Sequence, residues 1–113
     1  MIALSPAALA ESLTLAGSTV RRGSRIVFDA HHTFGPYSNQ YSRVSATVTA
    51  VVHQDGETYV ELWCSTYCGH HDRWFRVQGA TFRAVSRSRH DGRFVDTWSN
   101  CSLYRFEVLQ TAA

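Results

Sequence analysis

The segment from Cys64 to Asp72 contains the side chains best suited to metal binding or nucleophilic chemistry. It brings two thiols and two imidazoles together, and sulfur and imidazole nitrogen are the usual ligands of structural zinc. The candidate ligands are Cys64, Cys68, His70 and His71. The Cys-x3-Cys spacing is unusual for zinc knuckles, however, and Cys64 falls on the apolar face of a predicted strand, where thiols usually pack as small hydrophobic groups. No metal or other cofactor is therefore predicted, and a small zinc-stabilised domain stays an alternative.

The same segment permits a cysteine nucleophile. Cys68 is close in sequence to His70 and His71, either of which could act as a base, and Asp72 could orient the imidazole. No nucleophile elbow, phosphate-cradling glycine loop or pair of catalytic carboxylates accompanies these residues in the sequence. We therefore predict that the chain is not an enzyme.

Arginine supplies all eleven basic residues, because the chain contains no lysine. A GC-rich genome is one explanation, and selection for planar donors that bind phosphate or carboxylate in a bidentate manner is the other. The net charge is only +2, but the second half is locally basic, since Asp91 and Asp96 are the only acids between residues 73 and 105. Its arginines are Arg73, Arg76, Arg83, Arg87, Arg89, Arg93 and Arg105.

Three of these arginines fall on one face of a predicted strand over residues 80–89. They are Arg83, Arg87 and Arg89, and Arg93 follows the next turn. Such a face could bind an acidic protein surface. It could also bind nucleic acid, with stacking surfaces on Trp74, Trp98 or Tyr104, or it could simply be solvated. The interpretation as a partner-binding surface stays open at this point.

A second candidate surface is the segment 31–42, which the sequence predicts to be a long loop. It contains Phe34, Tyr37 and Tyr41, and aromatic side chains of this kind are common anchors of protein interfaces. They could equally fold back to cover the core. The first interpretation makes all three candidate partner-binding residues.

Alternation of apolar and polar residues predicts the strands that position these groups. The pattern is clearest where Val44, Ala46, Val48, Ala50 and Val52 alternate with polar residues. Two Asp-Gly pairs, at residues 55–56 and 91–92, predict tight turns. The predicted strands cover residues 25–28, 44–52, 58–64, 73–78, 80–89, 94–99 and 103–109.

These strands fall into two similar units, residues 44–78 and 80–110, each predicted to be a three-strand meander. The sequence Tyr59–Trp63 aligns with Phe94–Trp98. A short amphipathic helix is predicted over residues 6–16, because Ser5 and Pro6 suit its start and Gly17 suits its end. The predicted fold class is mainly β (α+β): an antiparallel curled sheet or small barrel of about six or seven strands with one N-terminal helix.

Composition places the chain among ordinary globular proteins. Its 113 residues, 44% hydrophobic and 18% charged, suit one domain over residues 1–113. No apolar run approaches the roughly 20 residues that span a bilayer, so no membrane partner is predicted. Three cysteines cannot all pair within one chain, which favours a reducing compartment and a cytoplasmic location.

The sequence thus predicts a small non-enzymatic interaction protein with a protein partner. One form is an inhibitor of the phage or mobile-element type that docks on a host protein complex handling nucleic acid, since small lysine-free domains are common among such products. A β-barrel module that binds nucleic acid directly is the first alternative, and the zinc-stabilised domain is the second. The oligomeric state is not predicted, although an exposed strand edge could pair with a second copy.

Overall fold

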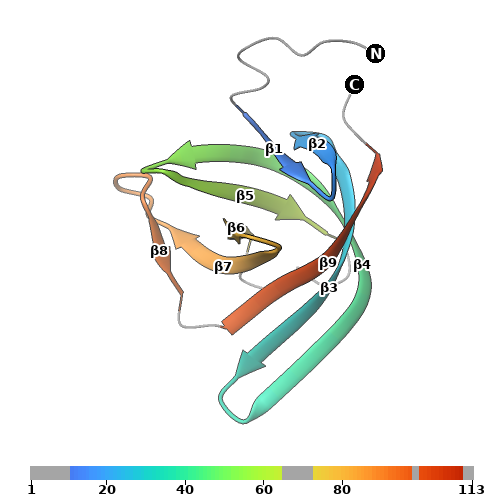
Figure 1. Cartoon of the computed structure of the whole chain (residues 1–113). Helices are drawn as coiled ribbons and strands as arrows, with labels where there is room; N and C mark the ends of the chain where they lie inside the picture. Colours follow the sequence, from blue (N-terminus) through green and yellow to red (C-terminus); the bar gives the residue numbers. More distant parts are fainter. Residues whose placement is uncertain (1–10, 65–72, 98–99, 111–113) are drawn as a thin grey trace.

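The computed structural model describes residues 11–64, 73–97 and 100–110, and in these ranges the chain forms nine β-strands (Figure 1). All strand pairs are antiparallel. This confirms the predicted mainly β, antiparallel fold class. The strands are β1 (Ser12–Leu15), β2 (Ser18–Arg21), β3 (Arg25–Phe34), β4 (Tyr37–Gln54), β5 (Glu57–Trp63), β6 (Trp74–Gln78), β7 (Thr81–Arg87), β8 (Phe94–Asp96) and β9 (Asn100–Gln110).

Six strands close into a barrel in the order β3-β4-β5-β6-β7-β9. The last strand returns to the first strand of the barrel, because β9 pairs with β3 from Arg25–Gln110 to Thr33–Asn100. The seam between β7 and β9 is the shortest, with Phe82 opposite Leu103 and Arg83 opposite Ser102. Of the two predicted forms, a curled sheet and a barrel, the structure has the barrel.

Inward-facing apolar side chains from every barrel strand fill the interior. The alternation that predicted the strands also selects this core: Val44, Ala46 and Val48 of β4 are buried and point inward. The fully buried core side chains with the largest volumes are Phe28, Phe75, Phe82, Ile26, Leu62 and Leu103.

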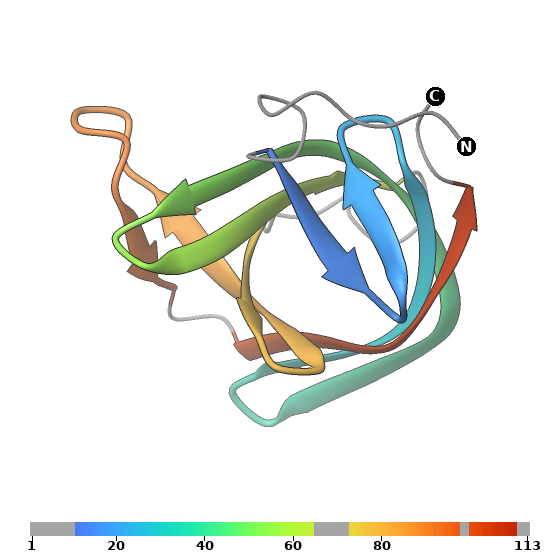
Figure 2. The same ribbon diagram turned by 45° about the horizontal axis from the view of Figure 1, so that its top comes forward.

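A hairpin of β1 and β2 lies across one end of the barrel (Figure 2). The prediction of a helix over residues 6–16 is therefore wrong from Ser12 onward, and residues 6–10 lie outside the described ranges. Gly17 does have a positive φ of 80°, but Ala16 has one of 49° as well. Consecutive positive φ values define a type I′ hairpin turn rather than a helix end. Leu15 and Val20 then enter the barrel core from the two strands of this hairpin.

Replacing Ala16 by asparagine distinguishes this hairpin from the predicted helix. Asparagine tolerates the left-handed conformation better than alanine, so the variant is expected to raise the free energy of unfolding by about 0.5–1 kcal/mol. In a helix the same change would lower it by about 0.5 kcal/mol. Urea denaturation followed by tryptophan fluorescence gives the sign, and a decrease would contradict the hairpin.

The two predicted units differ in their final strand. In the first unit β4, β5 and β6 follow one another in the sheet as a meander, with Asp55 and Gly56 in the predicted tight turn. In the second unit β9 pairs with β7 and β3, and β8 pairs with β7 only, within the described residues. Both β8 and β9 lie along the same side of β7: β9 pairs with its first half, at Phe82 and Arg83, and β8 pairs with its end, from Val85 to Arg87. The strand β9 can therefore pair with both β7 and β3 and close the barrel.

The segment 31–42, predicted as a loop, is instead the distal part of the β3–β4 hairpin. Phe34 lies opposite Tyr37, and Gly35 and Pro36 form the turn. Pairing of β3 with β4 continues from this turn to the Ala30–Tyr41 pair. We call residues 31–42 the distal arm, and Figure 1 shows it extending away from the rest of the barrel.

Candidate functional site

An open groove of about 420 Å³ lies on the outer face of β6 and β7. Pairing of Trp74 with Val85 brings the start of β6 beside the end of β7, so Arg73 joins two of the predicted arginines. No carboxylate is among the described residues that line the groove. We call it the arginine groove, and its lining residues are Arg73, Trp74, Val85, Ser86, Arg87, Ser88 and Arg89.

A small aromatic cluster underlies the groove, outside the barrel core. Phe94 of β8 stacks on Tyr59 of β5, with ring centroids 3.8 Å apart and planes at 10°, and meets Trp74 edge-on at 5.0 Å. Tyr59 and Val85 are only 6% and 2% exposed, although neither belongs to the core cluster. The short β8 strand thus covers part of the outer face, and its Phe94 packs against Trp74 of the groove.

Arg87 is held in place by this cluster. Its guanidinium lies 4.9 Å from the ring centroids of both Trp74 and Phe94, and its Nε donates a hydrogen bond of 3.2 Å to the carbonyl oxygen of Gly92. Gly92 has a φ of 70°, and a Cβ there would lie 3.7 Å from an Arg87 Nη. Stacking and hydrogen bonding therefore fix the guanidinium before any ligand arrives.

Arg89 lies on the turn that joins β7 to β8. The backbone N–H of Ser88 donates to the Arg93 carbonyl at 2.8 Å, and the N–H of Gly92 donates to the Ser88 carbonyl at 3.1 Å. Asp91 accepts a hydrogen bond from the backbone N–H of Arg93 at 3.0 Å. This bond, with a second from Ser88, lowers the pKa of Asp91. The Asp91 carboxylate thus stabilises the turn that carries Arg89.

The four arginines predicted to form one binding surface do not all lie in the groove. Arg83 is exposed but lies opposite Arg76, outside the groove. Arg76 forms an ion pair of 2.9 Å with Asp96, and hydrogen bonding with Tyr59 followed by that with Asp96 raises its pKa. Arg93 is exposed on the turn. Of the predicted arginines, the structure brings only Arg87 and Arg89 together in the groove.

No protein-family model, curated protein or solved structure matches this chain. Its function must therefore be inferred from the arrangement of its own residues. The part of the chain that the structure describes contains no helix that could span a bilayer.

The distal arm separates the predicted aromatic residues. The side chain of Tyr37 is 68% exposed near the tip, whereas Tyr41 is half-buried and packs against the core. On the face opposite these tyrosines, Nε2 of His31 and the hydroxyl of Ser38 form a hydrogen bond of 2.7 Å. Both interpretations of this segment thus apply in part: Tyr41 covers the core, and Tyr37 is available to a partner.

The predicted metal ligands lie mostly outside the described residues. Cys64 is 5% exposed within the core cluster, while Cys68, His70, His71 and Asp72 are not described. Within the described ranges no group of three potential ligand side chains could hold a metal ion. The zinc hypothesis stays a prediction.

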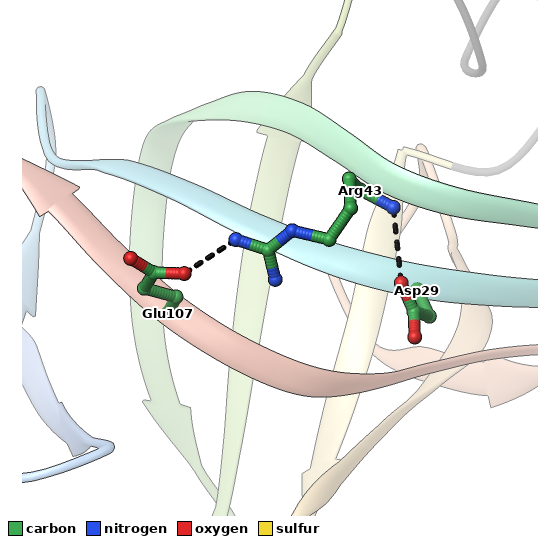
Figure 3. Close-up of polar contacts among 3 residues, drawn as sticks. All are labelled: Asp29, Arg43 and Glu107. Carbon is green, nitrogen blue, oxygen red and sulfur yellow. Dashed lines mark hydrogen bonds and ion pairs between the residues drawn. The ribbon is translucent and has the colours of Figure 1, made fainter.

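A polar cluster that the sequence did not predict surrounds Asp29, in the middle of β3 (Figure 3). This aspartate is only 8% exposed, and its Oδ1 accepts a hydrogen bond of 3.0 Å from the backbone N–H of Arg43 on β4. Its Oδ2 lies 3.4 Å from Nη1 of Arg105 on β9. The Arg43 side chain reaches across β3 to an ion pair with Glu107 of β9. One carboxylate therefore connects three neighbouring strands.

Both neighbours of β3 have irregular pairing at this point. Arg43 and Arg105 have positive φ values of 55° and 56°, and the register shifts beside Asp29 on both sides. Such bulges bend strands and help a sheet to close. Asp29 therefore has a structural role in the barrel. Its signal in the sequence was a single acid within the apolar run Ile26–Ala30.

Proposed function

We propose that this chain is a small non-enzymatic interaction module that docks on an acidic surface of a protein partner through the arginine groove. The observation that carries the proposal is the fixed guanidinium of Arg87, stacked on two rings at 4.9 Å and anchored to Gly92. Pre-organised arginines lose little conformational entropy on binding and are frequent hot spots of protein interfaces. Arg73 and Arg89 add positive charge beside it.

A protein partner fits the groove better than a nucleic-acid strand does. Sequence-independent binding of single strands uses aromatic faces on which bases stack. Trp74 is already in contact with Arg87 and Phe94, and Arg105 lies 5.7 Å from the ring centroid of Tyr104. The net charge of +2 is also low for binding along a phosphate backbone. A compact cluster of cations suits a local patch of carboxylates.

Removing the groove charges tests this proposal. The double variant Arg87→Ala with Arg89→Ala is expected to weaken partner binding by about 10–100-fold, because it removes the fixed guanidinium and its neighbour. Arg22→Ala with Arg25→Ala is the matched control, since both side chains are exposed and lie outside the groove. Partners captured from nuclease-treated lysate are identified with each variant, and affinities are then measured by calorimetry with the purified partner.

Arg87→Lys separates charge from geometry in the same assay. Lysine keeps the positive charge but cannot stack as a planar group on Trp74 and Phe94, so we expect it to restore only a minor part of the affinity. Equal losses in the groove and control variants would contradict the proposal. Mobility shifts with DNA and RNA that fall steeply with salt, and depend on Arg87 and Arg89, would replace it with direct nucleic-acid binding.

A further inference from the structure

In the distal arm, one edge of β4 pairs with no strand of the described part of the chain. Within the described residues, β4 pairs with β5 only from Thr47 onward, so residues 37–46 pair with β3 alone. Figure 1 shows the tip of the arm projecting away from the rest of the barrel, and β9 lies along the β3 side of the arm as far as Thr33. An exposed strand edge offers a row of backbone donors and acceptors to another strand.

The geometry of the turn identifies the backbone groups at this edge. A two-residue turn closes with a hydrogen-bonded pair, here Phe34 with Tyr37. Hydrogen-bonded and non-hydrogen-bonded pairs then alternate along an antiparallel ladder. The N–H and C=O groups of Ser38 and Gln40 consequently point away from β3, toward the open edge.

This edge lacks the usual protection against pairing. Residues 37–42 carry no charged side chain, no proline and no glycine, whereas natural edges are commonly blocked by charges, prolines or bulges. The bulge at Arg43 lies only at the base of the arm. Within the described part of the chain, the outward backbone groups of Ser38 and Gln40 therefore face no other strand.

We propose that two copies of this chain associate by antiparallel pairing of these edges, with Asn39 opposite Asn39 of the second copy. A twofold axis makes the same strand its own antiparallel partner, and the neutral edge brings no like charges together. In this register Ser38 and Gln40 of the two copies form the hydrogen-bonded pairs, so the outward N–H and C=O groups meet.

The same register also pairs the tyrosines. Tyr37 lies opposite Tyr41 of the second copy at a non-hydrogen-bonded position, where side chains approach most closely. The Tyr37 side chain, 68% exposed in the single chain, thereby gains an aromatic neighbour at each end of the interface. A second copy would both accept and donate hydrogen bonds at the outward backbone groups of Ser38 and Gln40 and cover the exposed Tyr37 ring. For this reason a second copy fits the edge best.

Sedimentation equilibrium tests the association. We expect a concentration-dependent dimer for the wild-type chain. Gln40→Pro removes an outward N–H without breaking the pairing of β4 with β3, so it should raise the dimer dissociation constant about 10-fold or more. Asn39→Lys places two positive charges at the twofold axis and should have an effect in the same direction. Gln78→Lys adds the same charge at an exposed position away from the arm and should leave the dimer unchanged.

Disulfide trapping tests the register. In a Cys68→Ser background, Asn39→Cys is expected to form a covalent dimer rapidly under mild oxidation, while Ser38→Cys should not, because residue 38 faces residue 40 of the second copy. Cys64 and Cys101 are buried and should not compete. Folding of each variant is checked by circular dichroism.

A wild-type chain that stays monomeric up to high concentration would overturn this inference, as would a dimer unaffected by Gln40→Pro and Asn39→Lys. A monomer that instead captures extended peptides through the arm would replace the second copy with a foreign strand. The arginine groove lies on other strands, so these outcomes are independent of the Arg87 and Arg89 variants.

Discussion

Replacing Phe82 by alanine is expected to lower the free energy of unfolding by about 3–5 kcal/mol, the usual cost of truncating a fully buried phenylalanine. Phe82 is 0% exposed on β7. Its ring centroid lies 4.2 Å from that of Phe106 on β9, and Phe106 lies 5.9 Å from Phe28 on β3. This series of rings spans the β7–β9 seam, where two residue pairs join the described parts of the two strands. The substitution thus leaves a cavity where the backbone contributes least.

Urea denaturation at equilibrium measures this loss. Leu109→Ala is the matched control, because Leu109 lies on β9 and is 51% exposed, and its effect should remain within about 0.5 kcal/mol. A cost below about 1 kcal/mol for Phe82→Ala would contradict a barrel closed by packing at this seam.

Replacing Asp29 by alanine is expected to cost about 2–3 kcal/mol, because the backbone N–H of Arg43 loses a charged acceptor at a partly buried position. Asp29→Asn keeps an acceptor oxygen without the charge and should cost less. The bulges at Arg43 and Arg105 would lose the carboxylate that both contact. Weaker protection of amides in β3 and β4 against hydrogen exchange should accompany the loss of stability.

Glu107→Gln provides the comparison for Asp29. It removes only the ion pair with the Arg43 side chain, in which both side chains are more than half exposed. Exposed pairs of this kind contribute about 0–1 kcal/mol. Equal effects of Asp29→Ala and Glu107→Gln in the same denaturation experiment would show that the side-chain pair, and not the backbone bond, holds the bulge.

The strand pattern was predictable because alternation directly reflects which side chains face the interior. Val44–Val52 and the Asp55-Gly56 turn lie where the sequence placed them. The β1–β2 hairpin was not predictable, because Gly17 fits the end of a helix and a hairpin turn equally well. Burial of Leu15 and Val20 against the barrel decides between them, and tertiary contacts of that kind are not encoded in local spacing.

The candidate site was predictable only in part for a similar reason. Alternation along one strand correctly put Arg87 on an exposed face, and Arg89 followed it into the groove. The position of Arg73 beside them depends on the pairing of β6 with β7. The aromatic support of Arg87 depends on Phe94 of β8 packing over Tyr59 and against Trp74. Asp29 gained one partner from β4, its neighbour in the hairpin, and the other from β9, which is adjacent to β3 only after closure.

Closure of the barrel by β9 also determines the order of events during synthesis. Strand β3 has β4 and β9 as neighbours in the finished barrel, and its first residue, Arg25, pairs with Gln110 near the end of β9. The second neighbour of β3 is therefore missing until β9 has been synthesised. Until then the emerging chain has β3 to β7 as an open sheet with unsatisfied edges. Pairings between such distant residues slow folding and prolong exposure to aggregation. We therefore expect cooperative folding only after the final strand leaves the ribosome.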